Sequence, residues 1–309
     1  MKIYRDINQV KVSRPIVTIG SFDGVHLGHQ KVIKHLNSVA RSENGESVIF
    51  TFHPHPRLVL GTPCENLELL TTMSEKIDLL EQSGVRHLIV YPFTYAFSQL
   101  SYTEFVKQLL IDKLGIFKLI IGHDHHIGKN REGSFEALQQ LSLKLNFQLE
   151  QLDVLLLDHV NISSTTIRQA LKEGNIEQAN KFLGYCFSLQ GRVIHGQQVG
   201  RKIQFPTANI QPDDPHKIIP GKGVYAVTVE WEGTRYAGML NIGTRPTIND
   251  NKDDRSIEVH ILEFDQFIYE QHLHIRFIRK IREEHKFKSL DELKEQLSRD
   301  KLTVRRLLE

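Results

Sequence analysis

Cysteine is scarce in this chain, and its two residues, Cys64 and Cys186, lie far apart in the sequence. Two distant cysteines supply neither the paired spacing of a zinc site nor a disulfide framework. The chain also lacks an apolar run long enough to cross a membrane, and its first residues lack the apolar core of a signal peptide. These absences favour a cytoplasmic protein with no membrane partner.

Charge of a single sign is also missing. The 39 basic and 37 acidic residues leave a formal net charge of +2, and no run of like charge is long enough to act as an interaction tail. A broad basic surface is what nucleic-acid binding requires, so we expect no nucleic-acid partner. At 309 residues, 40% of them hydrophobic, the chain is long enough to form two domains with separate cores.

The first part of the chain alternates short apolar runs with amphipathic segments. The expected strands are 15–20, 47–52, 87–91, 118–122 and 154–157, and the expected helices are 29–40, 74–82, 103–114 and 135–145. Strands that are apolar on both faces and separated by helices predict a Rossmann-like α/β domain with a parallel sheet. Ligands of such sheets bind at the carboxyl ends of the strands.

A different pattern follows residue 185. Apolar residues then recur with period two, as in antiparallel strands, over 223–231, 236–242, 256–264 and 272–279. Two terminal helices are expected over 290–297 and 302–308. The sequence therefore predicts two domains, 1–184 and 185–309, the second an antiparallel β-barrel with terminal helices.

The segment GSFDGVHLGH, residues 20–29, joins the first strand to the first helix. Glycines at such a turn let the backbone approach phosphate, and the helix N-terminus offers free N–H groups. His26 and His29, three residues apart, can bracket one phosphate and donate hydrogen bonds to oxygens that gain charge during phosphoryl transfer. Either histidine alone would more simply be a packing residue.

A second segment, ISSTTIR at residues 162–168, opens a later helix. Its hydroxyl side chains are typical helix caps, and Arg168 on the first turns can neutralise a phosphate leaving group. Alone, this segment would be read only as a cap. Its place after a strand, like that of residues 20–29, favours a shared phosphate site.

Together these segments resemble the HxGH and ISSTxIR signatures of the nucleotidyltransferase superfamily. In that family an acceptor phosphate attacks the α-phosphorus of ATP and pyrophosphate leaves. The resemblance implies that His26 and His29 are catalytic. It also implies an ATP-binding set, which comprises Gly20, Phe22, Asp23, Gly28, Ser163, Ser164, Thr165 and Arg168.

Two further segments resemble stretches specific to bacterial FAD synthetases. They are TFHPHP at residues 51–56 and GHDHHIGKNREG at residues 122–133. The resemblance implies flavin or nucleotide contacts from His53, Gly122, Asp124 and Arg131. Aromatic positions of the family pattern are replaced in the segment from His125 to Ile127.

Asp124, His125 and His126 could instead ligate a metal, since histidine and aspartate bind many ions. Adjacent residues rarely aim at one ion, and phosphate chemistry would bring Mg²⁺ with ATP. The metal interpretation is therefore the less favoured one.

The segment GRKIQFPTAN, residues 200–209, opens the chemistry of the second domain. Proline sets the start of a strand, so that Thr207 and Asn209 project to one face, where their oxygens can complete a Mg²⁺ shell. A plain strand start is the alternative. The segment resembles the ATP-binding loop of riboflavin kinases, to which it would contribute Gly200, Arg201, Pro206, Thr207 and Asn209. Gln204 replaces a usual glycine and would be strained at positive φ.

In the segment IEVHIL, residues 257–262, alternation places Glu258 and His260 on the face opposite Ile257 and Val259. A carboxylate there can accept the proton of a hydroxyl that attacks the γ-phosphorus of ATP. By itself Glu258 would be read as a solvated strand carboxylate. The segment matches riboflavin kinases, which implies that Glu258 is the general base, and in REEHKF, at residues 282–287, Arg282 is a flavin contact.

The resemblance runs from Gly20 to about Lys301 through eight ordered motifs. It is to bacterial bifunctional riboflavin kinase/FAD synthetases, and implies that riboflavin is phosphorylated to FMN, which then receives AMP to give FAD. The implied ligands are riboflavin, FMN and ATP with Mg²⁺. Two rival readings are a transferase for another phosphorylated acceptor and a flavin-sensing protein without turnover. The sequence leaves self-association open.

Overall fold

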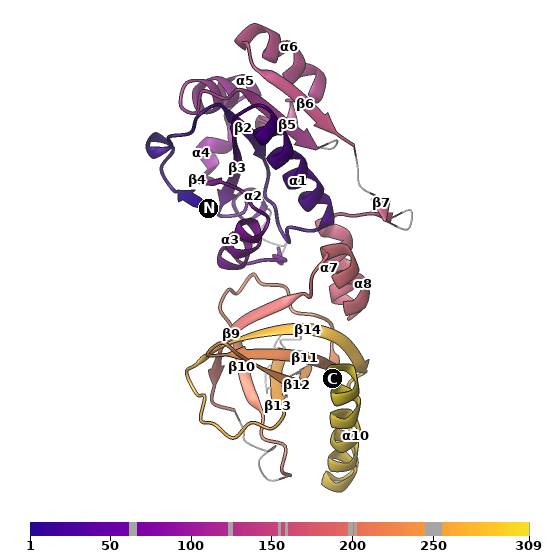
Figure 1. Cartoon of the computed structure of the whole chain (residues 1–309). Helices are drawn as coiled ribbons and strands as arrows, with labels where there is room; N and C mark the ends of the chain where they lie inside the picture. Colours follow the sequence, from indigo (N-terminus) through magenta and orange to yellow (C-terminus); the bar gives the residue numbers. More distant parts are fainter. Residues whose placement is uncertain are drawn as a thin grey trace. The chain divides into compact units, whose positions relative to one another are not determined.

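The computed structural model describes residues 1–61, 67–122, 126–153, 156–157, 160–196, 200, 203–244 and 255–308. The chain forms two compact units, Met1–Ser164 and Thr165–Glu309. Figure 1 shows the first unit in indigo to magenta and the second in pink to yellow. We describe each unit separately.

A six-stranded parallel sheet forms the centre of the first unit. Its strands, in spatial order, are β1 (Lys2–Tyr4), β4 (His87–Pro92), β3 (Glu46–His53), β2 (Pro15–Ile19), β5 (Lys118–Gly122) and β6 (Gln148–Leu152). Because all six strands run the same way, their carboxyl ends lie along one edge of the sheet. The loops that follow β2, β3 and β5, which carry three of the predicted motifs, therefore start from the same edge.

Helices cover both faces of this sheet (Figure 1). They are α1 (Leu27–Ser42), α2 (Pro56–Leu60), α3 (Met73–Gln82), α4 (Tyr95–Ser98), α5 (Tyr102–Phe105), the π-helix η2 (Val106–Ile111) and α6 (Phe135–Leu145), with short 3₁₀ turns η1 (Ile7–Gln9) and η3 (Lys129–Arg131). Successive side chains of a strand point to opposite faces. Val17 and Phe50 accordingly pack in one apolar cluster, with η2 and α6, while Ile16 and Ile49 pack in another, with α1 and α3.

One predicted strand of this sheet is wrong. The sixth strand is β6, Gln148–Leu152, whereas the strand was expected over 154–157. Leu156–Leu157 forms β7, which pairs with β8, Val160–Asn161, in a separate two-stranded ribbon. The sequence misleads because β6 is an edge strand in which three of the five residues are polar, so it lacks the apolar run typical of a central strand.

The second unit contains a closed antiparallel barrel. Its strands, in spatial order, are β10 (Ala208–Pro212), β13 (Arg255–Ile261), β12 (Thr234–Thr244), β11 (Gly223–Trp231), β14 (His272–Arg282) and β9 (Ser188–Ile194), which pairs again with β10. Inward residues such as Tyr225, Val227, Val259 and Phe277 are fully buried. The predicted combination of a parallel α/β domain and an antiparallel barrel is confirmed.

Helices α7 (Ser164–Lys172) and α8 (Ile176–Leu183) precede the barrel, and α10 (Leu290–Leu308) follows it. The side chain of Asn180 in α8 donates to the Phe277 carbonyl of β14 at 2.9 Å, which attaches α8 to the barrel. The two expected terminal helices are in fact one continuous helix, α10. Its apolar residues, including Leu297 and Val304, pack against an outer cluster of the barrel, so the polar stretch between the two expected helices stays helical.

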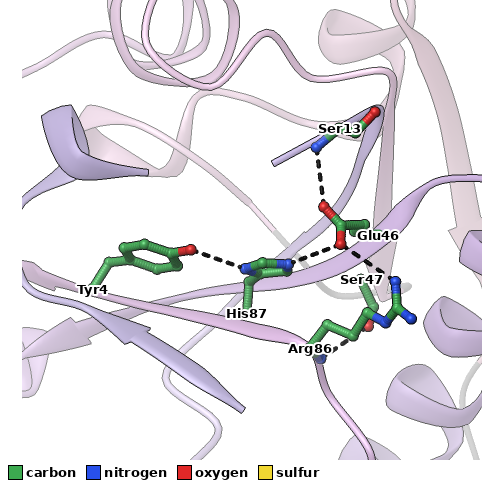
Figure 2. A network of polar contacts seen from close by, with 6 residues as sticks. All are labelled: Tyr4, Ser13, Glu46, Ser47, Arg86 and His87. Carbon is green, nitrogen blue, oxygen red and sulfur yellow. Dashed lines mark hydrogen bonds and ion pairs between the residues drawn. The ribbon is translucent and has the colours of Figure 1, made fainter. Parts of the chain in front are cut away.

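A polar network anchors the edge strand β1 at the amino end of the sheet (Figure 2). The Tyr4 hydroxyl lies 3.2 Å from Nδ1 of the buried His87, and Nε2 of His87 lies 3.5 Å from the Glu46 carboxylate. Glu46 also accepts a hydrogen bond from the Ser13 backbone at 3.0 Å and one from Arg86 at 3.3 Å. Burial lowers the pKa of His87 despite the neighbouring Glu46, so its imidazole is neutral at physiological pH. The network therefore attaches β1 and the segment at Ser13 to strands β3 and β4.

Removing one hydroxyl from this network should loosen β1. We expect Tyr4→Phe to lower the free energy of unfolding of the first unit by about 1 kcal/mol, the usual net worth of a partly buried hydrogen bond. Amide exchange of Ile3 and Tyr4 should accelerate, as measured by hydrogen–deuterium exchange. Tyr95→Phe, which removes the hydroxyl of a tyrosine that is 67% exposed, is the matched control. Equal stability of the two variants would contradict the anchoring role.

Candidate active sites

His26 and His29 lie together at the start of α1, directly after the carboxyl end of β2. His26 is the N-cap of the helix, and its Nδ1 accepts a hydrogen bond from the His29 backbone at 3.4 Å. The two rings stack with centroids 3.7 Å apart and planes at 19°. A neutral imidazole whose Nδ1 accepts a bond carries its proton on Nε2. His26 is thus oriented by the helix end that the motif was predicted to form.

Close packing around these rings explains the neighbouring glycine. A Cβ at Gly28 would lie 3.1 Å from two atoms of the His26 ring, tighter than most real contacts. The preceding loop is also strained, since Phe22 and Val25 adopt φ of 48° and 35°. The Phe22 ring lies 5.0 Å from the His29 ring. The loop therefore packs the Phe22 ring closely against the histidine pair.

The side chain of Asp23 fixes the position of the loop between β2 and α1. Its side chain is 1% exposed, and its carboxylate accepts backbone hydrogen bonds from Leu70 at 3.0 Å and Thr71 at 3.1 Å. The Thr71 hydroxyl in turn accepts from the Gly24 backbone at 3.0 Å. A buried carboxylate needs such donors to compensate for lost hydration. These hydrogen bonds of the Asp23 carboxylate are to the protein, and its predicted role toward ATP remains a prediction.

The electrostatics favour a neutral His29. Burial lowers the pKa of His29 well below its usual value, and the nearby His26 and Lys76 lower it further. Within the described part of the chain, Nδ1 of His29 is buried and has no hydrogen-bond partner. An orphaned buried polar atom is unfavourable unless a ligand or water satisfies it. His29 lines a cavity of the first unit, so a ligand bound there could satisfy this atom.

The ISSTTIR segment meets the histidine motif at its first residues. The Ile162 carbonyl would lie 3.6 Å from a Cβ at Gly28, and the Ser164 hydroxyl donates to the Asp23 carbonyl at 3.0 Å. These contacts bring the two predicted signatures together. Thr165 and Arg168 belong to the second unit, so their roles toward ATP remain predictions, as does that of Ser163.

A cavity of about 740 Å³ opens beside the histidine pair. Of the predicted contact residues, Gly20, Phe22, Gly28, Gly122 and Arg131 line it, together with both histidines. His53 is exposed at the end of β3 and is not among the lining residues, whereas His55 is. Asp124 and His125 lie outside the described residues.

Three aromatic residues of this cavity were missed by the sequence analysis. Phe52, Phe93 and Phe97 contact one another, with ring centroids 5.4–5.7 Å apart. All three line the cavity. The available signal was the position of Phe52 inside the TFHPHP motif and the aromatic density of the segment after β4. The three rings give this cavity an apolar surface.

The loop before β10 has the strain that the sequence predicted. Gln204 adopts a φ of 66°, in the left-handed region where glycine is preferred. Gly200 accepts backbone hydrogen bonds from Ile203 at 3.2 Å and Phe205 at 2.9 Å, and a Cβ there would lie 2.2 Å from the Phe205 carbonyl oxygen. The loop is a tight turn over these residues. Arg201 lies outside the described residues.

Thr207, Asn209 and Glu258 meet on the outer face of the barrel. The Thr207 hydroxyl donates to Oε2 of Glu258 at 3.2 Å, and Asn209 is the direct cross-strand partner of Glu258. A Cβ at Gly196 would lie 2.0 Å from Nδ2 of Asn209, so the glycine leaves the space that this amide occupies. A hydroxyl, an amide and a carboxylate supply the hard oxygen ligands that suit Mg²⁺. The structure thus brings the predicted metal-binding pair to the predicted base.

Arg282 is engaged within the protein. Its guanidinium contacts Oδ2 of the buried Asp300 in α10 through Nε and Nη2, each at 2.9 Å, and donates to the Glu283 carbonyl at 3.1 Å. Gln296 donates to the other oxygen of Asp300 at 2.9 Å. These bonds couple the end of β14 to α10. The predicted flavin contact of Arg282 remains a prediction.

A second cavity, of about 320 Å³, lies in the barrel unit. Pro206 and Thr207 line it, as do the loop residues Phe264 and Tyr269 that follow β13. The Tyr269 ring stacks on His195 with centroids 4.1 Å apart and planes at 17°. Among the described residues, no group of three or more histidine, cysteine, aspartate or glutamate side chains could hold a metal ion.

These two sites define a protein with a nucleotidyltransferase unit and a flavokinase barrel. The FAD synthetase family model matches residues 9–166, and the riboflavin kinase family model matches residues 183–308. The chain belongs to the bifunctional riboflavin kinase/FMN adenylyltransferase family. The predicted family and its two activities are confirmed.

Curated relatives of that name match along nearly their whole length. The protein of Buchnera aphidicola from Schizaphis graminum is 39% identical, over 97% of this chain and 96% of its own. The Escherichia coli K12 protein is 37% identical, over 99% and 97%. The Bacillus subtilis protein is 38% identical, over 94% and 91%.

A solved structure also matches the whole chain. It is a Streptococcus pneumoniae protein described as a macrolide-efflux protein, with a TM-score of 0.87, 29% identity and 98% coverage of both chains. In this chain, no helix within the described ranges is both long and apolar enough to span a membrane. The similarity therefore supports the two-unit fold, and efflux is a description of that protein alone.

The packing of Gly196 against Asn209 gives a direct test of the second site. We expect Gly196→Ala to displace the Asn209 amide and to reduce riboflavin kinase activity by about 10- to 100-fold, as small misplacements of reacting groups do. FMN adenylyltransferase activity should not change. Gly233→Ala, at a positive-φ hairpin turn with no atom within 4 Å of the new Cβ, controls for general loss of stability. Comparable kinase activity in the two variants would refute the placement of Asn209.

Proposed function

We propose that the stacked His26–His29 pair catalyses adenylyl transfer to FMN, and that Glu258 with Thr207 and Asn209 catalyses phosphorylation of riboflavin. The observation that carries this proposal is the meeting of predicted motifs: His26 stacks on His29, and the Thr207 hydroxyl binds Glu258. In both cases residues that the sequence analysis assigned to the same reaction are in contact.

In the adenylyltransferase reaction, a phosphate oxygen of FMN forms a bond to the α-phosphorus of ATP. The bond from that phosphorus to the bridging oxygen breaks, and pyrophosphate leaves. The α-phosphate gains charge in the transition state, and pre-oriented imidazoles stabilise it by hydrogen bonding. His26 donates from Nε2, since its Nδ1 is occupied as the helix cap. The buried Nδ1 of His29 is the second group available to the substrate.

The acceptor flavin fits the aromatic wall of the same cavity. Phe52, Phe93 and Phe97 present ring faces and edges on which an isoalloxazine ring can pack. Arg131, which also lines the cavity, is a suitable partner for the FMN phosphate because guanidinium groups bind phosphate in a bidentate manner. We therefore propose Arg131 and the three phenylalanines as flavin contacts. ATP would contact the glycine-rich turn from Gly20 to Gly28.

In the kinase reaction, the terminal hydroxyl of riboflavin attacks the γ-phosphorus of ATP, ADP leaves, and the hydroxyl proton passes to Glu258. A carboxylate can serve as this base when it lies within hydrogen-bond reach of the attacking group. Glu258 is half-buried on β13 and already accepts one hydrogen bond, from Thr207. We propose that the nucleotide occupies the 320 Å³ cavity lined by Pro206 and Thr207.

Mg²⁺ fits the oxygen donors at this position. We propose that Thr207 and Asn209 hold the ion, while ATP phosphates and water complete its shell, as is usual for Mg²⁺ with nucleotides. A bound Mg²⁺ would neutralise the charge that develops on the phosphate oxygens. Thr207 and Asn209 lie beside the base because Asn209 pairs with Glu258 across the ladder.

We propose residues 1–184 as the adenylyltransferase domain and 185–309 as the kinase domain, a division close to the start of the kinase family match at residue 183. The two compact units of the structure divide the chain earlier, after Ser164, because α8 packs on the barrel. The near-neutral charge and scarce cysteines support a cytoplasmic enzyme without a nucleic-acid partner. Self-association stays open.

The two activities should separate by mutation. We expect His29→Ala to reduce conversion of FMN to FAD by about 100-fold or more, as loss of one transition-state donor does, while riboflavin is still phosphorylated. Glu258→Gln should do the reverse, with a kinase loss of about 100-fold or more. Chromatography of the flavins formed with ATP and Mg²⁺ measures both. FAD formation within a few-fold of the unmutated enzyme in His29→Ala would remove the role proposed for this motif.

A further inference from the structure

Strand β13 presents two polar side chains to the loop that precedes β10. Side chains of a strand alternate between faces, so Glu258 and His260 share the face opposite the buried Val259. Glu258 accepts the hydrogen bond of Thr207, and His260 contacts the residue before it, since its Nδ1 lies 2.8 Å from the Pro206 carbonyl oxygen. Two residues of one strand thus hold two consecutive residues of the loop.

The direction of the His260 bond is determined by its partner. A carbonyl oxygen only accepts hydrogen bonds, so Nδ1 of His260 carries the proton and donates. Proline has no N–H, which leaves the carbonyl as the only backbone polar group of Pro206. The ladder between β10 and β13 begins two residues after Pro206, at Ala208 and Val259. The imidazole therefore fixes the backbone at Pro206, just before the first residue pair of the ladder.

The His260 ring also packs against Phe205, which further fixes the loop before β10. The His260 ring meets the Phe205 ring edge to face, with centroids 5.2 Å apart and planes at 62°, and both residues are 8% exposed. The neighbouring Gln204 is in the left-handed region, a conformation that is unfavourable for an L-residue. A strained loop keeps its shape only where the surroundings impose it. His260 supplies a polar and an aromatic contact at that place.

The imidazole makes these contacts without adding charge to the site. Burial lowers the pKa of His260, and although the Pro206 carbonyl raises it, Lys301 of α10 lowers it further. The ring is therefore neutral at physiological pH. A neutral donor leaves the charge balance of ATP, Mg²⁺ and Glu258 unaltered.

We propose that His260 is a positioning residue of the riboflavin kinase reaction: by donating to the Pro206 carbonyl and packing on Phe205, it places the Thr207 hydroxyl beside Glu258. This inference rests on the proposed roles of Thr207 and Glu258. His260 touches neither substrate nor metal in this scheme. It positions the Thr207 hydroxyl through the backbone of Pro206.

The test compares two substitutions of the same histidine. Asparagine places its amide nitrogen near the position of Nδ1 and retains the donor, whereas leucine fills similar space without one. We expect His260→Leu to lower kcat/KM for Mg·ATP by about tenfold or more, because misplacement of a substrate-contacting group is costly. The KM for riboflavin should change less than threefold, and His260→Asn should stay within about threefold of the unmutated enzyme in all kinase constants.

FMN adenylyltransferase activity, measured in the same samples, reports that the first unit is intact. Near-ultraviolet circular dichroism and thermal unfolding show whether the barrel remains folded, and His216→Leu, at an exposed histidine, is the matched control. The inference is overturned if His260→Leu keeps its kcat/KM for Mg·ATP, or if His260→Asn is equally impaired while folded. If Thr207→Ala and Glu258→Gln retain kinase activity, the proposed roles of Thr207 and Glu258 are wrong, which is a different outcome from failure of the role of His260.

Discussion

The buried carboxylate of Asp23 is the constraint on which the adenylyltransferase site depends. At 1% exposure, this group would cost several kcal/mol if left without donors, so the backbone of Leu70 and Thr71 must stay against it. The requirement ties the loop after β2 to the segment before α3. Lys76 in α3 is buried as well: burial lowers its pKa while Asp23 raises it. The histidine pair therefore follows a loop that cannot shift without leaving the buried Asp23 carboxylate short of hydrogen-bond donors.

The kinase site obtains its rigidity in another way. Its groups stand on a strand face, where the ladder between β10 and β13 aligns Asn209 with Glu258. This alignment is set by strand pairing within a closed barrel and does not depend on one buried ion. The weak point is the loop before the ladder, which two side chains of β13 hold. One site is thus held by a buried carboxylate and the other by strand register.

Both sites also contain backbone in an unfavourable conformation. Phe22 and Val25 have positive φ beside the histidines, and Gln204 has positive φ beside Thr207. Strain of this kind persists where neighbouring contacts over-determine the chain, and it concentrates near functional groups. In each case the strained residue lies within three residues of a proposed substrate contact.

Periodicity and motif order were enough to determine the fold class, the central strands, the family and the residues that would meet. Strand and helix periods are local, because they are set by burial on one or two faces, and the resemblance to riboflavin kinases implied strain at Gln204 if that position had positive φ. The tertiary structure decided which strand forms the sheet edge, that α10 is continuous, and that Arg282 binds Asp300. It also decided that Phe52, Phe93 and Phe97 form one wall and that His260 holds Pro206. These features depend on contacts between residues far apart in the chain, which no local pattern of side chains encodes.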